Sequence, residues 1–225
     1  HIVRNTDQLL GAFFQPIMFL VLFSAVFGGA ISLSLPEGVT YLSFLMAGII
    51  VQTVAFGSTT TALAITNDLQ KGIVDRFRSL PMSNLAVLNG HVVSDLFRNT
   101  ISTVVMLLAG LVLGFRSSAS LIDWIAITGI LVLFTLAFSW LMAIMGVLAK
   151  SVEGVQWMSF IIIFPLTFAS SAFVPTDGMN KYLKAFAENQ PISQVIEAVR
   201  ALMLGTPIGN HGWLAVFWCL FLVVI

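Results

Sequence analysis

The chain has 225 residues, of which 58% are hydrophobic and only 9% are charged, and its formal net charge is zero. Soluble domains are about 45–50% apolar and about 25% charged, so this composition excludes an ordinary water-soluble domain and indicates a membrane protein. The zero net charge gives no indication of nucleic-acid binding. The single cysteine, Cys219, excludes a disulfide framework and a thiolate metal site.

Six apolar stretches follow one another along the chain. A membrane-spanning helix needs about 20 mostly apolar residues, and five stretches reach that length. A sixth begins near Trp213 and is still apolar at the last residue, Ile225, so we expect it to be truncated. The five complete stretches are residues 13–33, 41–65, 96–115, 121–149 and 155–174. The sequence therefore predicts an all-α integral membrane protein with six transmembrane helices in a single domain, residues 1–225.

Orientation follows from the Lys and Arg residues between the spans. With the N-terminus inside, the cytoplasmic segments hold six of these residues and the outer segments hold four. Because cytoplasmic loops carry the excess of basic residues, this bias predicts residues 67–83 on the cytoplasmic side and residues 175–211 outside. None of the predicted spans has an ionisable residue at its centre, which argues against transport driven by protons or sodium.

The segment 67–83, between the second and third spans, concentrates charge in a chain with little of it. Asn67 and Gln70 resemble a capping box, and Pro81 would end the helix that they begin. Apolar residues recur at helical spacing on one face of this segment: Leu69, Ile73, Phe77 and Leu80. The pattern predicts an amphipathic helix along the membrane surface. It is either a docking surface for a partner or a solvated connector that is only anchored at the interface.

The segment 175–211 has the features of two short helices. Pro191 suits a first helical position, and Gly205 suits a helix stop. Apolar residues between them share one helix face, and a shorter apolar patch at Tyr182, Leu183 and Phe186 precedes them. Such helices either dip into the outer side of the membrane or only pack on the bundle.

Several short motifs carry a resemblance to a known family. They are the segment 67–83 with Pro81-Met82-Ser83, Gly90-His91-Val92-Val93-Ser94-Asp95, Phe173-Val174-Pro175-Thr176-Asp177, Asn189-Gln190-Pro191-Ile192 and Glu197-Ala198-Val199-Arg200-Ala201-Leu202. In this order and placement the chain resembles ABC-2 type exporter permeases, and within them the daunorubicin-resistance (DrrB-like) permeases of actinobacteria. The resemblance implies a bundle of six transmembrane helices in the bacterial cytoplasmic membrane. It also implies a second permease, identical or related, and separate ABC ATPase subunits that bind ATP and magnesium, with no cofactor on this chain.

The resemblance also assigns the contact with the ATPase. The segment 67–83 would be the coupling helix, and the loop 150–154 would make a second, smaller contact. An interface helix before the first span is typical of the family, and only residues 1–12 of it would remain here. The implied coupling residues are Asp68, Lys71, Asp75, Arg76, Phe77, Arg78 and Glu153.

Two functions remain to be weighed. The first is the membrane subunit of an ATP-driven exporter of amphipathic drugs or lipids. Its path would be lined by polar groups in the second and fifth spans: Gln52, Thr53, Ser58, Gln156 and Ser159. Their alternative role is hydrogen bonding between helices. The second function is a non-transporting membrane protein, either an intramembrane enzyme or an assembly scaffold. Co-purification of an ATPase subunit would separate the two functions.

Overall fold

The computed structural model describes residues 6–32, 35–36, 38–72 and 85–224. Regular structure within these residues is helical. In chain order the helices are α1 (Thr6–Ile31), α2 (Tyr41–Gly57), α3 (Thr59–Gln70), α5 (Leu85–Val112), α6 (Leu121–Leu148), α7 (Val152–Phe168), the 3₁₀ turn η3 (Thr176–Gly178), α8 (Lys181–Asn189), α9 (Pro191–Leu204) and α10 (His211–Val224).

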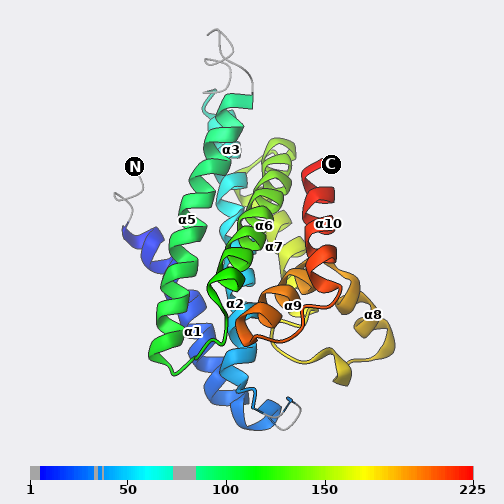
Figure 1. The fold of residues 1–225 in the computed structure, drawn as a ribbon. Coiled ribbons are helices and arrows are strands. Elements are labelled where there is room, and N and C mark those ends of the chain that lie inside the picture. The colour runs from blue at the N-terminus through cyan, green and yellow to red at the C-terminus, as the bar shows by residue number, and fades with distance from the viewer. Residues whose placement is uncertain (1–5, 33–34, 37, 73–84, 225) are drawn as a thin grey trace.

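The long helices form one bundle (Figure 1). The chain runs alternately down and up through α1, the continuous pair α2–α3, α5, α6, α7 and α10. We call the end where α3 stops and α5 starts the upper end, as Figure 1 shows it, and the opposite end the lower end. Among the described residues, four helices are long and apolar enough to cross a membrane: Phe14–Ile31, Tyr41–Gln70, Leu88–Val112 and Leu121–Leu148. The apolar helices α7 and α10 are shorter, with 17 and 14 residues.

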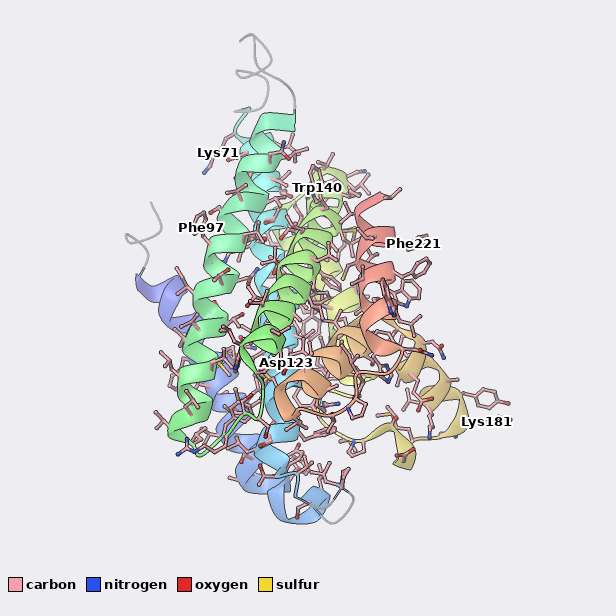
Figure 2. All side chains as sticks on the ribbon, viewed as in Figure 1. Lys71, Phe97, Asp123, Trp140, Lys181 and Phe221 are labelled. Carbon is pink, nitrogen blue, oxygen red and sulfur yellow. The ribbon has the colours of Figure 1, made fainter. Side chains whose placement is uncertain are left out.

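The bundle has apolar residues outside, and its mainly apolar interior also holds polar residues, as α5 illustrates. Its buried stripe includes Asp95, Asn99 and Ser102, whereas Phe97 and Ile101 on the opposite face are 66% and 51% exposed. Figure 2 shows Phe97 of α5 and Phe221 of α10 pointing away from the bundle on opposite sides. Exposed apolar faces of this extent need lipid or a protein partner as their surroundings. The polar stripe faces inward because a polar group facing lipid would lose its hydrogen bonds.

Glycines allow the central helices to approach closely. A Cβ atom on Gly48 of α2 would lie 2.7 Å from the Cα atom of Ala172, in the turn after α7. A Cβ atom on Gly146 of α6 would lie 2.6 Å from the carbonyl oxygen of Ala62 in α3. Small residues at such crossings replace side-chain contacts by backbone packing, which is how helices associate in lipid.

Several helix boundaries differ from those predicted. α1 begins at Thr6 and α5 at Leu85, both earlier than the apolar runs indicated. The predicted fifth span is shorter as a helix: α7 ends at Phe168, and turns follow it. In contrast, the predicted start of α9 at Pro191 and its stop at Gly205 are confirmed, with Gly205 in the left-handed region at φ 66°.

The predicted capping box at Asn67 is wrong. α3 runs without interruption through this residue, and the Asn67 side chain donates to the carbonyl of Leu63 at 3.0 Å, one turn back in the same helix. The helix instead ends at Gln70, capped by Lys71 and followed by Gly72 with φ 64°. Residues 67–70 are therefore the top of the preceding helix. The remainder of the predicted coupling helix, residues 73–83, lies outside the described residues.

Candidate functional site

The upper end brings together two segments that are far apart in the sequence. The Gln70 side chain at the top of α3 donates to the carbonyl of Lys150 in the α6–α7 loop at 3.2 Å. Asp68 is held by His91 of α5, with 2.8 Å between Oδ2 and Nε2. The start of the predicted coupling segment 67–83 and the predicted second contact loop 150–154 therefore lie side by side.

The predicted coupling residues divide into two groups. Asp68, Lys71 and Glu153 lie at the upper end, where Lys71 and Glu153 are exposed and Asp68 is half-buried by its contact with His91. Lys71 is seen at this end in Figure 2. The other four, Asp75, Arg76, Phe77 and Arg78, lie outside the described residues.

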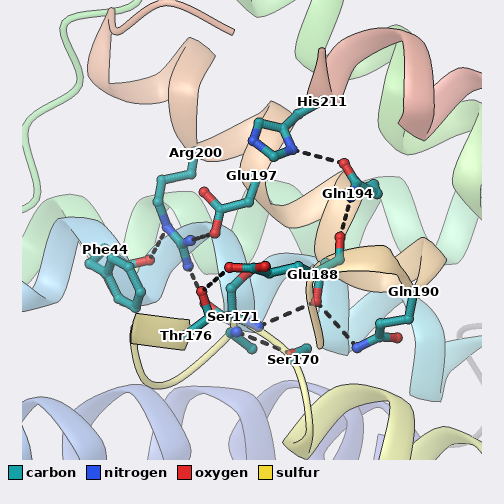
Figure 3. A network of polar contacts seen from close by, with 12 residues as sticks. Phe44, Ser170, Ser171, Thr176, Glu188, Gln190, Gln194, Glu197, Arg200 and His211 are labelled. Carbon is teal, nitrogen blue, oxygen red and sulfur yellow. Dashed lines mark hydrogen bonds and ion pairs between the residues drawn. The ribbon is translucent and has the colours of Figure 1, made fainter. Parts of the chain in front are cut away.

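In the lower half of the bundle α9 packs against α2, α6 and α10, with α8 beside it, and a network of polar contacts centred on Arg200 attaches α9 to the bundle (Figure 3). The Arg200 guanidinium donates to the carbonyls of Phe44 in α2 and Ser171 after α7, at 3.1 and 2.6 Å. It also contacts the Glu197 carboxylate at 2.5 Å and lies 3.6 Å from the centre of the Phe44 ring. One buried side chain thus connects α2, the end of α7 and α9.

Arg200 is buried, although the sequence placed its segment outside the membrane. We expected the charges of the segment 175–211 to be exposed on the outer side, but Arg200 is only 6% exposed. Burial lowers the pKa of its guanidinium, and the Glu197 carboxylate opposes that shift. The buried guanidinium stays positively charged because its N–H donors bond to two carbonyls and a carboxylate. Its role is structural, since it faces the protein and not solvent.

The rest of the lower end continues this network. The Gln194 amide oxygen of α9 accepts from the His211 ring at 2.8 Å, and its amide nitrogen donates to the carbonyl of Glu188, so the starts of α9 and α10 are connected. On the exposed side Lys184 of α8 pairs with Asp177 at 2.6 Å. Asp177 and, more weakly, Glu188 raise the pKa of the Lys184 ammonium.

The residues predicted to line a transport path occupy different environments. On α2, the hydroxyls of Thr53 and Ser58 donate to carbonyls of their own helix at 2.7 and 3.0 Å, and Gln52 is 7% exposed. On α7, Gln156 is exposed on the outside of the bundle, whereas Ser159 is buried with no hydrogen-bond partner for its hydroxyl. Ser159 therefore has a buried hydroxyl without a partner, and the hydroxyls of Thr53 and Ser58 bond within their own helix.

A cavity of about 640 Å³ opens at the lower end between α1, the start of α2 and the end of α5. Its lining includes Ser24, Ser32, Tyr41 and Gly114. None of the five predicted path residues belongs to its lining, so this cavity does not connect them.

A second polar cluster, which the sequence reasoning missed, lies inside the bundle. Asp95 of α5 is 1% exposed, and its carboxylate accepts from Ser139 of α6 at 2.9 Å. It also accepts from the hydroxyls of Thr60, at 3.2 Å, and Thr61 in α3, and it pairs with Arg98 one turn along α5. We call this cluster, Asp95, Arg98, Thr60, Thr61 and Ser139, the buried joint.

Arg98 completes the joint at the junction of α2 and α3. Its guanidinium donates to the backbone carbonyl of Gly57 at 3.0 Å. That carbonyl is available because the Thr61 amide donates to Ser58, three residues back, at 3.1 Å. A tight turn of this kind inside a helix often marks a hinge.

Asp95 was assigned to the loop before the third span because its charge interrupts the apolar run. In the structure the span begins earlier, so Asp95 and Arg98 lie inside it, although not at its centre. The prediction that no span has an ionisable residue at its centre did not cover these two residues, which lie within the third span but away from its centre. The spacing of Asp95, Asn99 and Ser102, four and three residues apart, is the signal that places polar groups on one inward helix face.

Comparisons with known proteins agree with this architecture. A profile of the ABC-2 type transporter family matches residues 1–204. The chain is 34% identical over 199 residues to the daunorubicin resistance ABC transporter permease protein DrrB1 of Streptomyces coeruleorubidus, covering 88% of this chain and 69% of that protein. It is 30% identical over 213 residues to the probable doxorubicin resistance ABC transporter permease protein DrrC of Mycobacterium tuberculosis, covering 91% and 73%. Nodulation protein J of Rhizobium leguminosarum is 24% identical over 224 residues, covering 96% and 83%.

The family match covers the buried joint, Arg200 and the α6–α7 loop, and it ends before α10. It decides between the two functions that the sequence left to be weighed, because the family and the two drug-resistance relatives are transport permeases. The chain therefore belongs to the ABC-2 type transporter family and is the multi-pass membrane permease subunit of an exporter whose ATP hydrolysis resides in a partner ABC subunit.

Proposed function

We propose that this permease moves amphipathic drugs or lipids outward across a bacterial cytoplasmic membrane, driven by an ATPase subunit docked on its upper end. Compounds of the daunorubicin and doxorubicin type are the first candidates, because the names of two relatives refer to resistance against them. Such a cargo suits a bundle whose interior combines apolar side chains with a few amides and hydroxyls.

One observation carries the docking site. The Gln70–Lys150 hydrogen bond brings the start of the segment 67–83 next to the loop 150–154, which are the two segments assigned to the ATPase contact. Lys71 and Glu153 are exposed at this end, so both signs of charge are available to a partner. Because two segments together form this surface, we favour a docking surface for a partner subunit over a solvated connector.

The membrane topology is part of the proposal. α7 and α10 serve as the fifth and sixth spans beside the four longer ones, and the upper end faces the cytoplasm while α8 and α9 lie outside. A second permease completes the transporter. The apolar window Phe14–Ile31 of α1 is only 6% buried, so it offers one face for that second permease as well as for lipid.

The test is ATP-driven transport by the whole complex. The permease and its ABC ATPase subunit are co-expressed, purified and placed in proteoliposomes with doxorubicin as a fluorescent probe. We expect the ATPase to co-purify and ATP to drive doxorubicin across the membrane. Exchanging the charges by Asp75→Arg with Arg76→Asp should leave the permease folded but reduce the amount of bound ATPase. Unchanged binding by this double variant would contradict docking at the segment 67–83.

The path residues are tested by cargo preference. Gln52→Leu and Ser159→Ala remove the two buried polar groups whose side chains do not bond to their own helix, with Thr53→Val as a control whose hydroxyl does. We expect the first two to change which compound stimulates ATP hydrolysis, with assembly intact. If only stability changes, other helices line the path.

A further inference from the structure

We infer that Asp95 is a positioning residue for transport, and that the buried joint passes movement of the upper end to the body of the bundle. The inference rests on the proposed function, in which the ATPase acts on the top of α3. The joint ties three helices to one carboxylate: α3 through Thr60 and Thr61, α6 through Ser139, and α5 through Asp95 itself.

The three helices meet at one depth. With a rise of about 1.5 Å per residue, Asp95 lies about 15 Å below the start of α5, and Thr61 and Ser139 lie about 14 Å below the upper ends of α3 and α6. The joint is therefore well inside the bundle and separated from the surface that meets the ATPase. Contacts made there decide whether α3 moves alone or with its neighbours.

α3 is attached at both of its ends. At the top, Gln70 and Asp68 bond to the α6–α7 loop and to α5, and one turn lower Thr66 donates to the Gly146 carbonyl of α6 at 2.7 Å. At the bottom, the buried joint fixes α3 where the tight turn at Ser58 separates it from α2. α3 is thus a rigid segment between the proposed docking surface and a hinge.

Arg98 gives the joint its connection to α2. Its guanidinium donates to the Gly57 carbonyl, which the Thr61 amide does not take and which also accepts from the Thr60 hydroxyl at 2.9 Å, while it pairs with Asp95. Charged hydrogen bonds in surroundings of low dielectric are strong and directional, so a change in the α2–α3 angle requires this set of contacts to move as a unit. The neighbouring Asn99, 2% exposed with both amide atoms unpartnered, leaves polar capacity for a second arrangement of the joint.

The experiment measures doxorubicin transported per ATP hydrolysed by the complex in proteoliposomes. The double variant Asp95→Asn with Arg98→Gln removes both charges together, which avoids leaving a buried cation unpaired. We expect assembly and ATP hydrolysis to be kept, and the transport-to-hydrolysis ratio to fall about fivefold or more, the lower range of coupling between linked sites. Asp95→Glu, which keeps the carboxylate, should have a ratio between that of the double variant and that of the unmodified protein.

A matched pair on α6 separates coupling from packing. Ser139→Ala removes a hydroxyl that bonds to Asp95, whereas Thr135→Val, one turn away and equally buried, removes a hydroxyl that bonds to the Leu131 carbonyl of its own helix. Only Ser139→Ala should lower the ratio. An unchanged ratio in the Asp95→Asn, Arg98→Gln variant, or an equal fall in Thr135→Val, would overturn the inference. Failure of the unmodified chain to bind an ATPase or to transport would instead contradict the proposed function.

Discussion

Replacing Arg200 by methionine removes the contacts that attach α9 to the bundle while keeping a long side chain in its place. The guanidinium makes three hydrogen bonds, to Phe44, Ser171 and Glu197, and stacks on the Phe44 ring. Removing one partner of a buried charged pair costs about 3–5 kcal/mol. We expect about 3 kcal/mol here, at the low end of that range, because the Glu197 side chain is 32% exposed and regains water.

The assay uses the one cysteine. Cys219 of α10 is free and buried, so a thiol-reactive dye reports unfolding of the detergent-solubilised protein as it is heated. For a chain of this length each kcal/mol moves the midpoint by about 2–4 °C, so Arg200→Met should lower it by roughly 6–12 °C. The midpoint of Arg200→Lys should lie between those of Arg200→Met and the unmodified protein, because an ammonium keeps the charge but cannot reproduce the planar fork of donors.

Lys184→Met is the matched control. It also breaks an ion pair of the lower end, but the partner Asp177 side chain is 89% exposed, and surface pairs contribute little to stability. Its midpoint should stay close to that of the unmodified protein. If Arg200→Met and Lys184→Met unfold at the same temperature, the Arg200 network does not hold α9 on the bundle.

Two further predictions concern topology and packing. A cysteine at position 184 should react with an impermeant maleimide on intact cells. Arg200→Cys should react only after unfolding. If Lys184→Cys is labelled only after lysis, the orientation in the membrane is the reverse of the one proposed. Gly48→Ala should lower the unfolding midpoint, at a cost of about 1–3 kcal/mol, because its Cβ would meet the backbone of Ala172. Gly129→Ala, which has open space around it, should leave the midpoint unchanged or raise it, and equal losses would contradict this packing.

The features that the sequence predicted correctly are those that depend on local chemistry. Long apolar runs reveal membrane helices because lipid requires them, and α2 and α6 begin at Tyr41 and Leu121 as predicted. Pro191 and Gly205 bound α9 because one fits a helix start and the other a left-handed stop.

The features that the sequence did not reveal depend on contacts between residues that are far apart in the chain and meet only in the folded protein. Arg200 was assigned to an exposed outer segment, yet its partner Phe44 lies 156 residues away, and no spacing in the chain records that contact. Asp95 was placed outside the membrane because its charge lowers the hydropathy of the segment. In the structure, hydroxyls from two other helices donate hydrogen bonds to its carboxylate inside the bundle. Asn67 fitted a capping pattern, but the strong helix from α2 through α3 simply continued past it.

The most direct test of the central claim is to map where the ATPase touches the permease. A photo-crosslinking amino acid is placed at position 71 or 153, at the upper end, and at position 184, at the lower end. Lys71 and Glu153 are exposed at the upper end, and Lys184 lies on α8, beside the lower half of the bundle (Figure 1). We predict crosslinks to the ATPase from positions 71 and 153 and none from position 184. Crosslinking from position 184, or its absence from both upper positions in an assembled complex, would contradict the account.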